Sequence, residues 1–302
     1  MIATTGFFDG VHLGHRLVIE RLVSEAHARG DESLVVTFWP HPRAVLQDGA
    51  RELRLLNTLD EKKELLRSLG VDRVEVLDFT RSFATLTAEQ YLREVLRDRF
   101  GVTTLLMGYD NRLGSDRLTA ASLKPAADGM GMELVELLPL SFRPEPLPNL
   151  SFRPSEASGE ISSTQIRTAL ENGDIASAEQ MLGYAYSLKG AVVAGNRLGR
   201  TIGFPTANMK LYEPLKLVPG RGVYAVDVEV LGRTFRGMTN IGTRPTVGGV
   251  TTSIETHILD FDEDIYGLPL RITFLRRLRD EVHFPSLEAL KHQLEIDREA
   301  CR

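Results

Sequence analysis

The pattern of apolar residues changes once along the chain, and this change limits the folds that the chain can adopt. In the first half, strand-like runs alternate with helix-like stretches, beginning with MIATTGFF (1–8) and the amphipathic segment 16–30, which Gly30 ends. The run SLVVTFW (33–39) is rich enough in β-branched and apolar residues for a buried parallel strand. Such alternation predicts an α/β fold with a doubly wound parallel sheet.

Beyond Gly183 the pattern consists of strand candidates with turn residues between them and no helix. These candidates are YSLKGAVVAG, GVYAVDVEVLG, RTFRGMTNIG, TSIETHILDF and LRITFLRRLR. Such a run predicts a mostly β domain, a small antiparallel barrel or sandwich. A terminal helix follows with Ser286 as its N-cap, and another helix is expected over about 164–182. We therefore expect two domains, residues 1–182 and 183–302.

Length, charge and cysteine content limit the classes of protein that the chain can belong to. A length of 302 residues is typical of two domains, and a net charge of −5 argues against a general affinity for nucleic acid or anionic membranes. No run approaches the roughly 20 apolar residues that span a bilayer, and the N-terminus lacks the layout of a signal peptide. A single cysteine, Cys301, favours a reducing compartment. We expect a cytoplasmic protein, and its oligomeric state stays open.

Unusual polar residues follow three of the predicted strands, at Asp9 to His12, Trp39 to Arg43 and Gly108 to Asn111. Parallel strands deliver their carboxyl ends to one edge of a sheet, where ligands bind. The segment GVHLGH also turns into a helix N-terminus, where backbone N–H groups favour an anion. Gly14 leaves room for close approach, and His12 and His15 can donate to a phosphate.

A phosphate cradle is therefore one interpretation of these histidines. A metal site completed by His41 is an alternative, although three ligands are usual and no other candidate is obvious. Surface histidines without a function are a third.

In the second half, GNRLGRTIGFPTAN (195–208) is a glycine-rich turn that can present backbone N–H groups to phosphates. It is not a Walker loop, because the glycine spacing is one residue short and Arg200 stands where lysine is required. Thr206 and Asn208 are hard oxygen donors that suit Mg²⁺. An ordinary glycine–proline turn is the alternative interpretation.

Strand alternation places Ser253, Glu255 and His257 on one face, which a solvated polar face would also explain. The basic run RRLR (276–279) in an acidic chain is more typical of a solvated strand end than of a nucleic-acid site.

Together, these motifs resemble those of a known family. GFFDGVHLGH (6–15) resembles the HxGH signature of the nucleotidyltransferase superfamily, and ISSTQIR (161–167) resembles the second signature of its flavin-specific branch. GRTIGFPTAN (199–208) resembles the riboflavin kinase signature, and NIGTRPT (240–246) and IETHILDFDEDIYG (254–267) resemble later kinase segments. Their order and spacing resemble the bifunctional bacterial riboflavin kinase/FAD synthetase family over nearly the whole chain.

This resemblance implies that the first, Rossmann-like domain joins FMN to ATP, giving FAD and pyrophosphate. His12 and His15 would stabilise the α-phosphate and the leaving pyrophosphate. Asp110 and Asn111 would lie near the flavin, although Asn111 and Leu113 replace aromatic residues of many relatives. The residues implied in nucleotide or phosphate binding are Gly6, Phe7, Asp9, Gly14, Ser162, Ser163, Thr164 and Arg167.

The second domain would be a riboflavin-kinase-like barrel that makes FMN from riboflavin and ATP. Thr206 and Asn208 would bind Mg²⁺ and the γ-phosphate, and Glu255 would take the proton of the riboflavin 5′-hydroxyl. The residues implied in nucleotide binding here are Gly199, Arg200 and Gly203.

Two other functions need comparison with this one. The first alternative is a different HxGH nucleotidyltransferase whose barrel is inactive. The presence of Thr206, Asn208 and Glu255 argues against this alternative. A flavin-binding or RNA-binding regulatory module would show no turnover and, for RNA, a strong salt dependence. The negative charge of the chain disfavours RNA binding.

Overall fold

The computed structural model describes residues 1–46, 53–108, 111–137, 161–195, 198–246 and 249–302. By its internal contacts the chain divides into two compact units, Met1–Ser162 and Ser163–Arg302. This division falls before the helical segment that the sequence assigns to the first domain.

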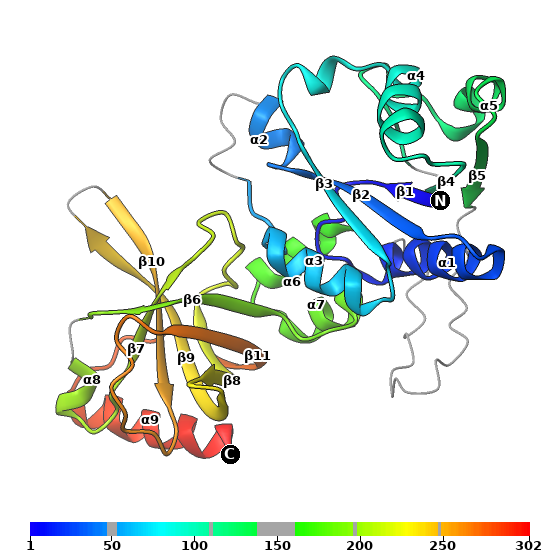
Figure 1. The fold of residues 1–302 in the computed structure, drawn as a ribbon. Helices are drawn as coiled ribbons and strands as arrows, with labels where there is room; N and C mark the ends of the chain where they lie inside the picture. The colour runs from blue at the N-terminus through cyan, green and yellow to red at the C-terminus, as the bar shows by residue number, and fades with distance from the viewer. Residues whose placement is uncertain (47–52, 109–110, 138–160, 196–197, 247–248) are drawn as a thin grey trace. The chain divides into compact units, whose positions relative to one another are not determined.

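A parallel sheet of five strands forms the centre of the first unit, in the order β3-β2-β1-β4-β5 (Figure 1). The strands are β1 (Ile2–Thr5), β2 (Ser33–Trp39), β3 (Arg73–Asp78), β4 (Thr104–Gly108) and β5 (Glu133–Leu137). Every neighbouring pair is parallel, which confirms the predicted sheet. The strand order reverses beside β1, so the ligand crevice of such a sheet is expected where β1 ends.

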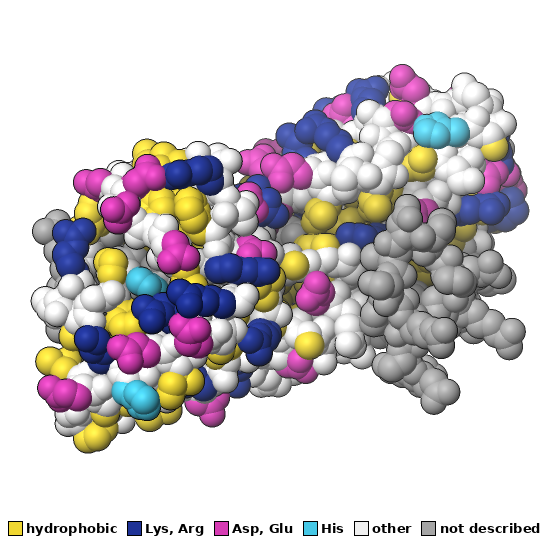
Figure 2. All heavy atoms as spheres, turned by 90° about the horizontal axis from the view of Figure 1, so that it is seen from below, with side chains coloured by type: hydrophobic (Ala, Val, Ile, Leu, Met, Phe, Trp, Pro, Cys, Tyr) yellow, Lys and Arg dark blue, Asp and Glu magenta, His cyan; other side chains and the backbone are white. Residues whose placement is uncertain are grey.

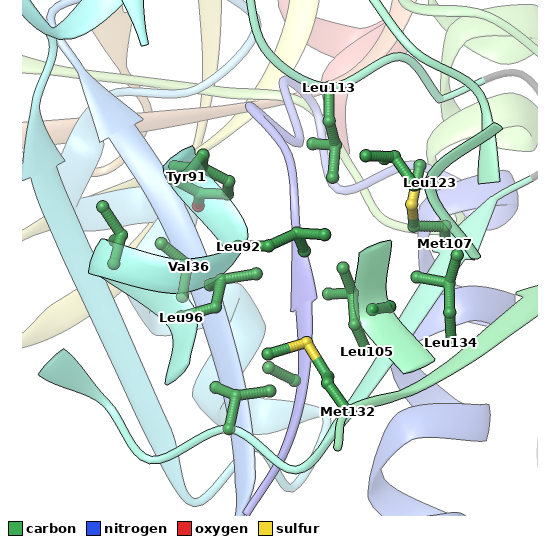
Figure 3. Packing of buried hydrophobic residues seen from close by; sticks show 14 of the residues in the cluster. Val36, Tyr91, Leu92, Leu96, Leu105, Met107, Leu113, Leu123, Met132 and Leu134 are labelled. Carbon is green, nitrogen blue, oxygen red and sulfur yellow. The ribbon is translucent and has the colours of Figure 1, made fainter. Parts of the chain in front are cut away.

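Helices cover both faces of this sheet. The helical segments are α1 (Leu13–Arg29), α2 (Pro42–Leu46), α3 (Leu59–Ser68), the 3-10 turn η2 (Phe83–Thr85), α4 (Ala88–Gln90), its π-helical continuation η3 (Tyr91–Arg99) and α5 (Ala120–Gly129). Alternate strand residues face opposite sides: Val36 packs with Leu92 and other residues of η3 and α5 (Figure 3), whereas Val35 packs with Ile19 of α1. The fold is therefore doubly wound.

Two helices of the first unit begin with capping boxes. Thr58 accepts from the Glu61 N–H at 3.2 Å, while the Glu61 carboxylate accepts from the Thr58 N–H at 3.0 Å. Thr87 and Gln90 form the same reciprocal capping box at the start of α4. These bonds satisfy N–H groups that the first turn of a helix leaves unpaired.

The second unit contains a closed antiparallel barrel in the order β10-β7-β6-β11-β8-β9 (Figure 1). Its strands are β6 (Ser187–Val193), β7 (Ala207–Leu211), β8 (Gly222–Val230), β9 (Arg233–Thr246), β10 (Gly249–Ile258) and β11 (Pro269–Arg279). The sequence pattern did not reveal β7, and it also missed the short helix α8 (Leu198–Thr201). Strand β7 is short and follows a proline, so its alternation is weak.

The helix expected over 164–182 is two helices, α6 (Ser163–Glu171) and α7 (Ile175–Leu182). The expectation was wrong because Gly173 adopts a left-handed conformation (φ 73°), which ends α6. Helix α6 and the turn after it contact the barrel: the Gly220 N–H donates to the Leu170 carbonyl at 2.8 Å, and a Cβ at Gly173 would lie 2.7 Å from the Tyr224 hydroxyl.

Helix α9 (Leu287–Cys301), capped by Ser286 as expected, is held against the barrel by arginines of β11. Arg279 donates to the buried Asp297 carboxylate at 2.8 and 3.0 Å, and Arg276 donates to the Ala300 carbonyl at 2.5 Å. The basic run therefore fastens the terminal helix. It is more than the solvated strand end that the sequence suggested.

Candidate active sites in the two units

The segment between β1 and α1 has an unusual backbone. Phe8, Gly10 and Val11 all have positive φ angles (52°, 88° and 37°), which are rare for residues other than glycine. The Asp9 carboxylate, 4% exposed, accepts from the N–H groups of Leu56 at 3.0 and 3.2 Å and of Asn57 at 3.3 Å. This segment is therefore held in its conformation by the residues that precede α3.

His12 and His15 are brought together by this turn. His12 is the N-cap of α1, and its Nδ1 accepts from the His15 N–H at 3.4 Å. The two rings stack with centroids 3.6 Å apart, and the Phe8 ring meets His15 edge-on at 5.3 Å. Burial, the neighbouring His12 and Lys62 hold the pKa of His15 well below 6.5. His15 is therefore neutral at physiological pH, and its buried Nδ1 makes no hydrogen bond to the described residues.

Gly14 lies where the two family signatures meet in the first unit. A Cβ at this position would lie 3.3 Å from the His12 ring and 3.7 Å from the Ile161 carbonyl oxygen. Ile161 begins the second signature, so its first residues run beside the HxGH turn. Ser162 ends the first unit, while Ser163, Thr164 and Arg167 begin the second unit in α6.

Lys62 of α3 is a member of this region that the sequence analysis missed. Its side chain is fully buried, and its Nζ donates to the Phe7 carbonyl at 2.6 Å. The same Nζ lies 3.5 Å from the Phe7 ring centroid and 3.5 Å from Thr37 Oγ1. Burial lowers the pKa of Lys62 to about 8, against the opposing effect of Asp9. From the sequence alone, Lys62 resembles the solvent-exposed charged residues of an amphipathic helix, so nothing marked it as buried.

The proposed flavin residues are only partly described. Asp110 lies outside the described residues, whereas Asn111 donates from its side-chain amide to the Thr5 carbonyl at 3.0 Å. Asn111 thus fastens the segment after β4 to the end of β1. Leu113, the second departure from the family pattern, is buried in the core of this unit.

The His41 ring packs on Phe7 with centroids 4.1 Å apart, and its Nδ1 accepts from the Arg43 N–H at 3.0 Å. Within the described residues, no group of three or more His, Cys, Asp or Glu side chains is placed to hold a metal ion. The structure therefore gives the metal interpretation of the histidines no support.

In the barrel, strand register places Glu255 between two asparagines. Glu255 of β10 is the cross-strand partner of Asn208 on β7 and of Asn240 on β9. Cross-strand partners point to the same face of a sheet, whereas Ile254 and Thr256 are buried on the opposite face. Glu255 and Asn208, which the resemblance connects, are thus neighbours. The sequence analysis did not single out Asn240, although it begins the kinase-like segment NIGTRPT (240–246); strand pairing places it beside Glu255.

The loop that carries Thr206 folds back on itself. The Gly199 carbonyl accepts from the N–H groups of Ile202 at 3.2 Å and Phe204 at 2.8 Å, and a Cβ at Gly199 would lie 2.1 Å from the Phe204 carbonyl oxygen. The Ile202 and Phe204 N–H groups are thus engaged within the loop, and phosphate binding by the other N–H groups of this turn stays a prediction.

Arg200 lies in α8, and Gly203 has a positive φ of 86°. The ring of His257, on the Glu255 strand, lies 2.8 Å through Nδ1 from the Pro205 carbonyl oxygen, next to Thr206.

On the face that Figure 2 shows, acidic and basic side chains are interspersed, without a broad area of one sign. None of the described helices has both the length and the apolar character needed to cross a bilayer.

The folds and sites define a class: a nucleotidyltransferase-type α/β unit joined to a riboflavin-kinase-type barrel. Two family models agree with this, because the FAD synthetase family matches residues 1–147 and the riboflavin kinase family matches residues 182–302. The bifunctional riboflavin kinase/FMN adenylyltransferase of Listeria monocytogenes is 37% identical, covering 100% of this chain and 91% of the relative. That of Escherichia coli K12 is 36% identical with the same coverage. The chain belongs to the bifunctional riboflavin kinase/FMN adenylyltransferase family.

A solved structure resembles both units together. A crystal structure from Streptococcus pneumoniae, named a macrolide-efflux protein, has a TM-score of 0.88 and 32% identity, covering 100% of this chain and 93% of that chain. Its name differs from those of the relatives above, which agree with both family models.

Proposed function

We propose that this chain phosphorylates riboflavin to FMN in its barrel and adenylylates FMN to FAD with the residues of segment 1–182, using ATP in both reactions. The observation that carries the proposal is that one chain holds both sets of signature residues, each at a folded site. His12 caps the helix that carries His15, at the switch point of the sheet, and Glu255 lies in register with Asn208. The proposed boundary at Leu182 separates the residues of the two reactions. It does not separate the two compact units, because α6 and α7 belong to the same unit as the barrel.

In adenylyl transfer, a phosphate oxygen of FMN attacks the α-phosphorus of ATP, and the bond to the β-phosphate breaks with its electron pair leaving on pyrophosphate. Charge grows on the phosphate oxygens, so fixed N–H donors stabilise the transition state more than the ground state. His12 and His15 act as these donors. Stacking of the two rings and the bond from the His15 N–H to His12 Nδ1 hold the rings in place before substrate arrives.

The remaining residues of this reaction bind the substrates. Ser162, Ser163, Thr164 and Arg167 contact the triphosphate, for which a guanidinium is a good bidentate partner. Gly6, Phe7 and Gly14 allow the chain to approach the nucleotide closely. The proposed role of Asp9 is indirect, because its carboxylate already accepts two N–H groups. Asp110 and Asn111 remain proposed flavin neighbours.

In riboflavin phosphorylation, Glu255 accepts the proton of the 5′-hydroxyl as that oxygen attacks the γ-phosphorus, and ADP leaves. Phosphoryl transfer depends on alignment and charge neutralisation. Thr206 and Asn208 supply neutral oxygen donors, which fit Mg²⁺ that arrives with ATP and keeps water and phosphate ligands. The ion would neutralise phosphate charge. Gly199, Arg200 and Gly203 shape the nucleotide side of the same loop.

The test is incubation of the purified protein with riboflavin, ATP and Mg²⁺, followed by chromatography of the flavins. FMN should appear first and FAD should follow, and omission of Mg²⁺ should stop FMN formation. Failure to form FMN from riboflavin, or FAD from supplied FMN, would refute the corresponding activity. We also propose a cytoplasmic location, in keeping with one buried cysteine and a requirement for ATP.

A further inference from the structure

Lys62 is a fully buried lysine of the first unit. It is 0% exposed on α3, although its neighbour Lys63 is partly exposed. A buried ammonium loses its hydration, so such groups are rare unless specific contacts compensate for the loss. The contacts in this case are the Phe7 carbonyl at 2.6 Å, Thr37 Oγ1 at 3.5 Å and the face of the Phe7 ring at 3.5 Å.

These contacts hold Phe7 directly or through Thr37. Phe7 lies in the HxGH signature, between β1 and the histidines. Thr37 Oγ1 also donates to the Phe7 carbonyl, at 3.1 Å. The Phe7 ring also packs with the His41 ring, whose centroid lies 4.1 Å away. Lys62 thus orders the start of the turn that carries His12 and His15, from a helix that contributes no residue to the family signatures.

The charge of Lys62 also reaches the histidines. It is one cause of the lowered pKa of His15, after burial and His12. A positive charge behind a site where negative charge grows favours the transition state, and low dielectric strengthens the effect.

Resting on the proposed adenylyl transfer, we propose that Lys62 is a positioning residue for this reaction, which fixes the Phe7 carbonyl and ring and supplies buried positive charge behind the His12–His15 pair. It acts through Phe7 and does not itself contact substrate. The hypothesis predicts an effect on kcat for FAD formation and little effect on riboflavin phosphorylation.

Three variants test the inference: Lys62→Met, Lys62→Arg and, as a matched control on the same helix, Lys63→Met. Lys62→Met should lower kcat for FAD formation by about tenfold or more, the scale of a partly lost electrostatic contribution, with the KM for FMN and ATP changing less. Lys62→Arg keeps the charge and should restore part of the loss. Lys63→Met should match the unchanged protein, as should FMN formation by all three variants.

A pH profile separates positioning by charge from simple packing. The charged or titratable groups around Lys62 are Asp9 in the turn between β1 and α1, His15 on α1 and His41, whose ring packs on Phe7. Lys62, with its pKa lowered to about 8, is the group that loses a proton above neutrality. In the unchanged protein, kcat for FAD formation should fall as pH rises through about 8. In Lys62→Arg that fall should disappear, because guanidinium stays charged.

The outcomes distinguish the inference from the proposed function. An unchanged protein that makes no FAD refutes the adenylyl transfer itself. An active unchanged protein whose kcat for FAD formation is flat from pH 7 to 9.5, or whose Lys62→Met variant is folded with normal kcat, overturns the role of Lys62. If the Lys62→Met variant does not fold, the pH profile of kcat for the unchanged protein still tests the role of Lys62.

Discussion

Residues 163–302 should behave as one folding unit, and shortening this fragment to 183–302 should damage it. Helices α6 and α7 bury five side chains that are at most 1% exposed: Ile166, Leu170, Ile175, Ala178 and Leu182. The Leu170 carbonyl accepts from the N–H of Gly220, which begins the entry to β8. Deleting these helices removes both the apolar contacts and this hydrogen bond, although the riboflavin kinase family match begins only at residue 182.

The substitution Leu170→Ala in the 163–302 fragment measures how much this packing contributes to the free energy of unfolding. Truncating a fully buried leucine removes its transfer free energy and leaves a cavity, at a cost of about 2–5 kcal/mol in the free energy of unfolding. With a urea m-value of about 2 kcal/mol/M, the midpoint should fall by roughly 1–2.5 M. Gln180→Ala, an exposed change on α7, should shift stability by less than about 0.5 kcal/mol.

The assay is urea unfolding followed by circular dichroism, with riboflavin phosphorylation as a second measure of folding. The 183–302 fragment should unfold at lower urea than 163–302, or be insoluble. Equal midpoints for the two fragments, or a Leu170→Ala midpoint within error of its parent, would show that these helices are not part of the barrel unit.

Three further results are expected. His12→Ala or His15→Ala should lower FAD formation by about 10²-fold or more with FMN formation nearly unchanged; equal loss of both activities, measured on one sample, would indicate misfolding. Glu255→Gln should lower kcat for riboflavin phosphorylation by roughly 10²–10⁴-fold with the KM for ATP little changed, and a rise in KM alone would make Glu255 a binding residue. Gly195→Ala should reduce FMN formation selectively, because the new Cβ would meet the Asn208 amide at 2.2 Å; normal Mg²⁺ dependence and rate would contradict the role of Asn208.

The sequence predicted the architecture well where patterns are local. The strand-like runs 1–8 and 33–39 located β1 and β2 of the parallel sheet, and Ser286 marked where α9 begins. Prediction from the sequence failed where contacts between distant residues determine the structure. Lys62 has the sequence environment of a solvent-facing charge, and only the packing of α3 buries it. Gly173 lies in a stretch that otherwise favours helix, and its left-handed backbone breaks that helix in two.

Dependence on contacts between distant residues also explains why the sequence motifs identified the barrel site only in part. Glu255 and Asn208 are far apart in the chain, and β7, which carries Asn208, was not predicted as a strand. Hydrogen-bonded register between β7, β10 and β9 aligns Asn208, Glu255 and Asn240 in one row. A slip of one residue would turn Glu255 toward the barrel interior and bring Thr256 into the row, since side chains alternate along a strand. The buried pair of Thr256 and Thr239, whose hydroxyls lie 2.8 Å apart inside the barrel, opposes that slip. The geometry of the proposed base therefore depends on residues of the opposite strand face, Thr256 next to it on β10 and Thr239 on β9.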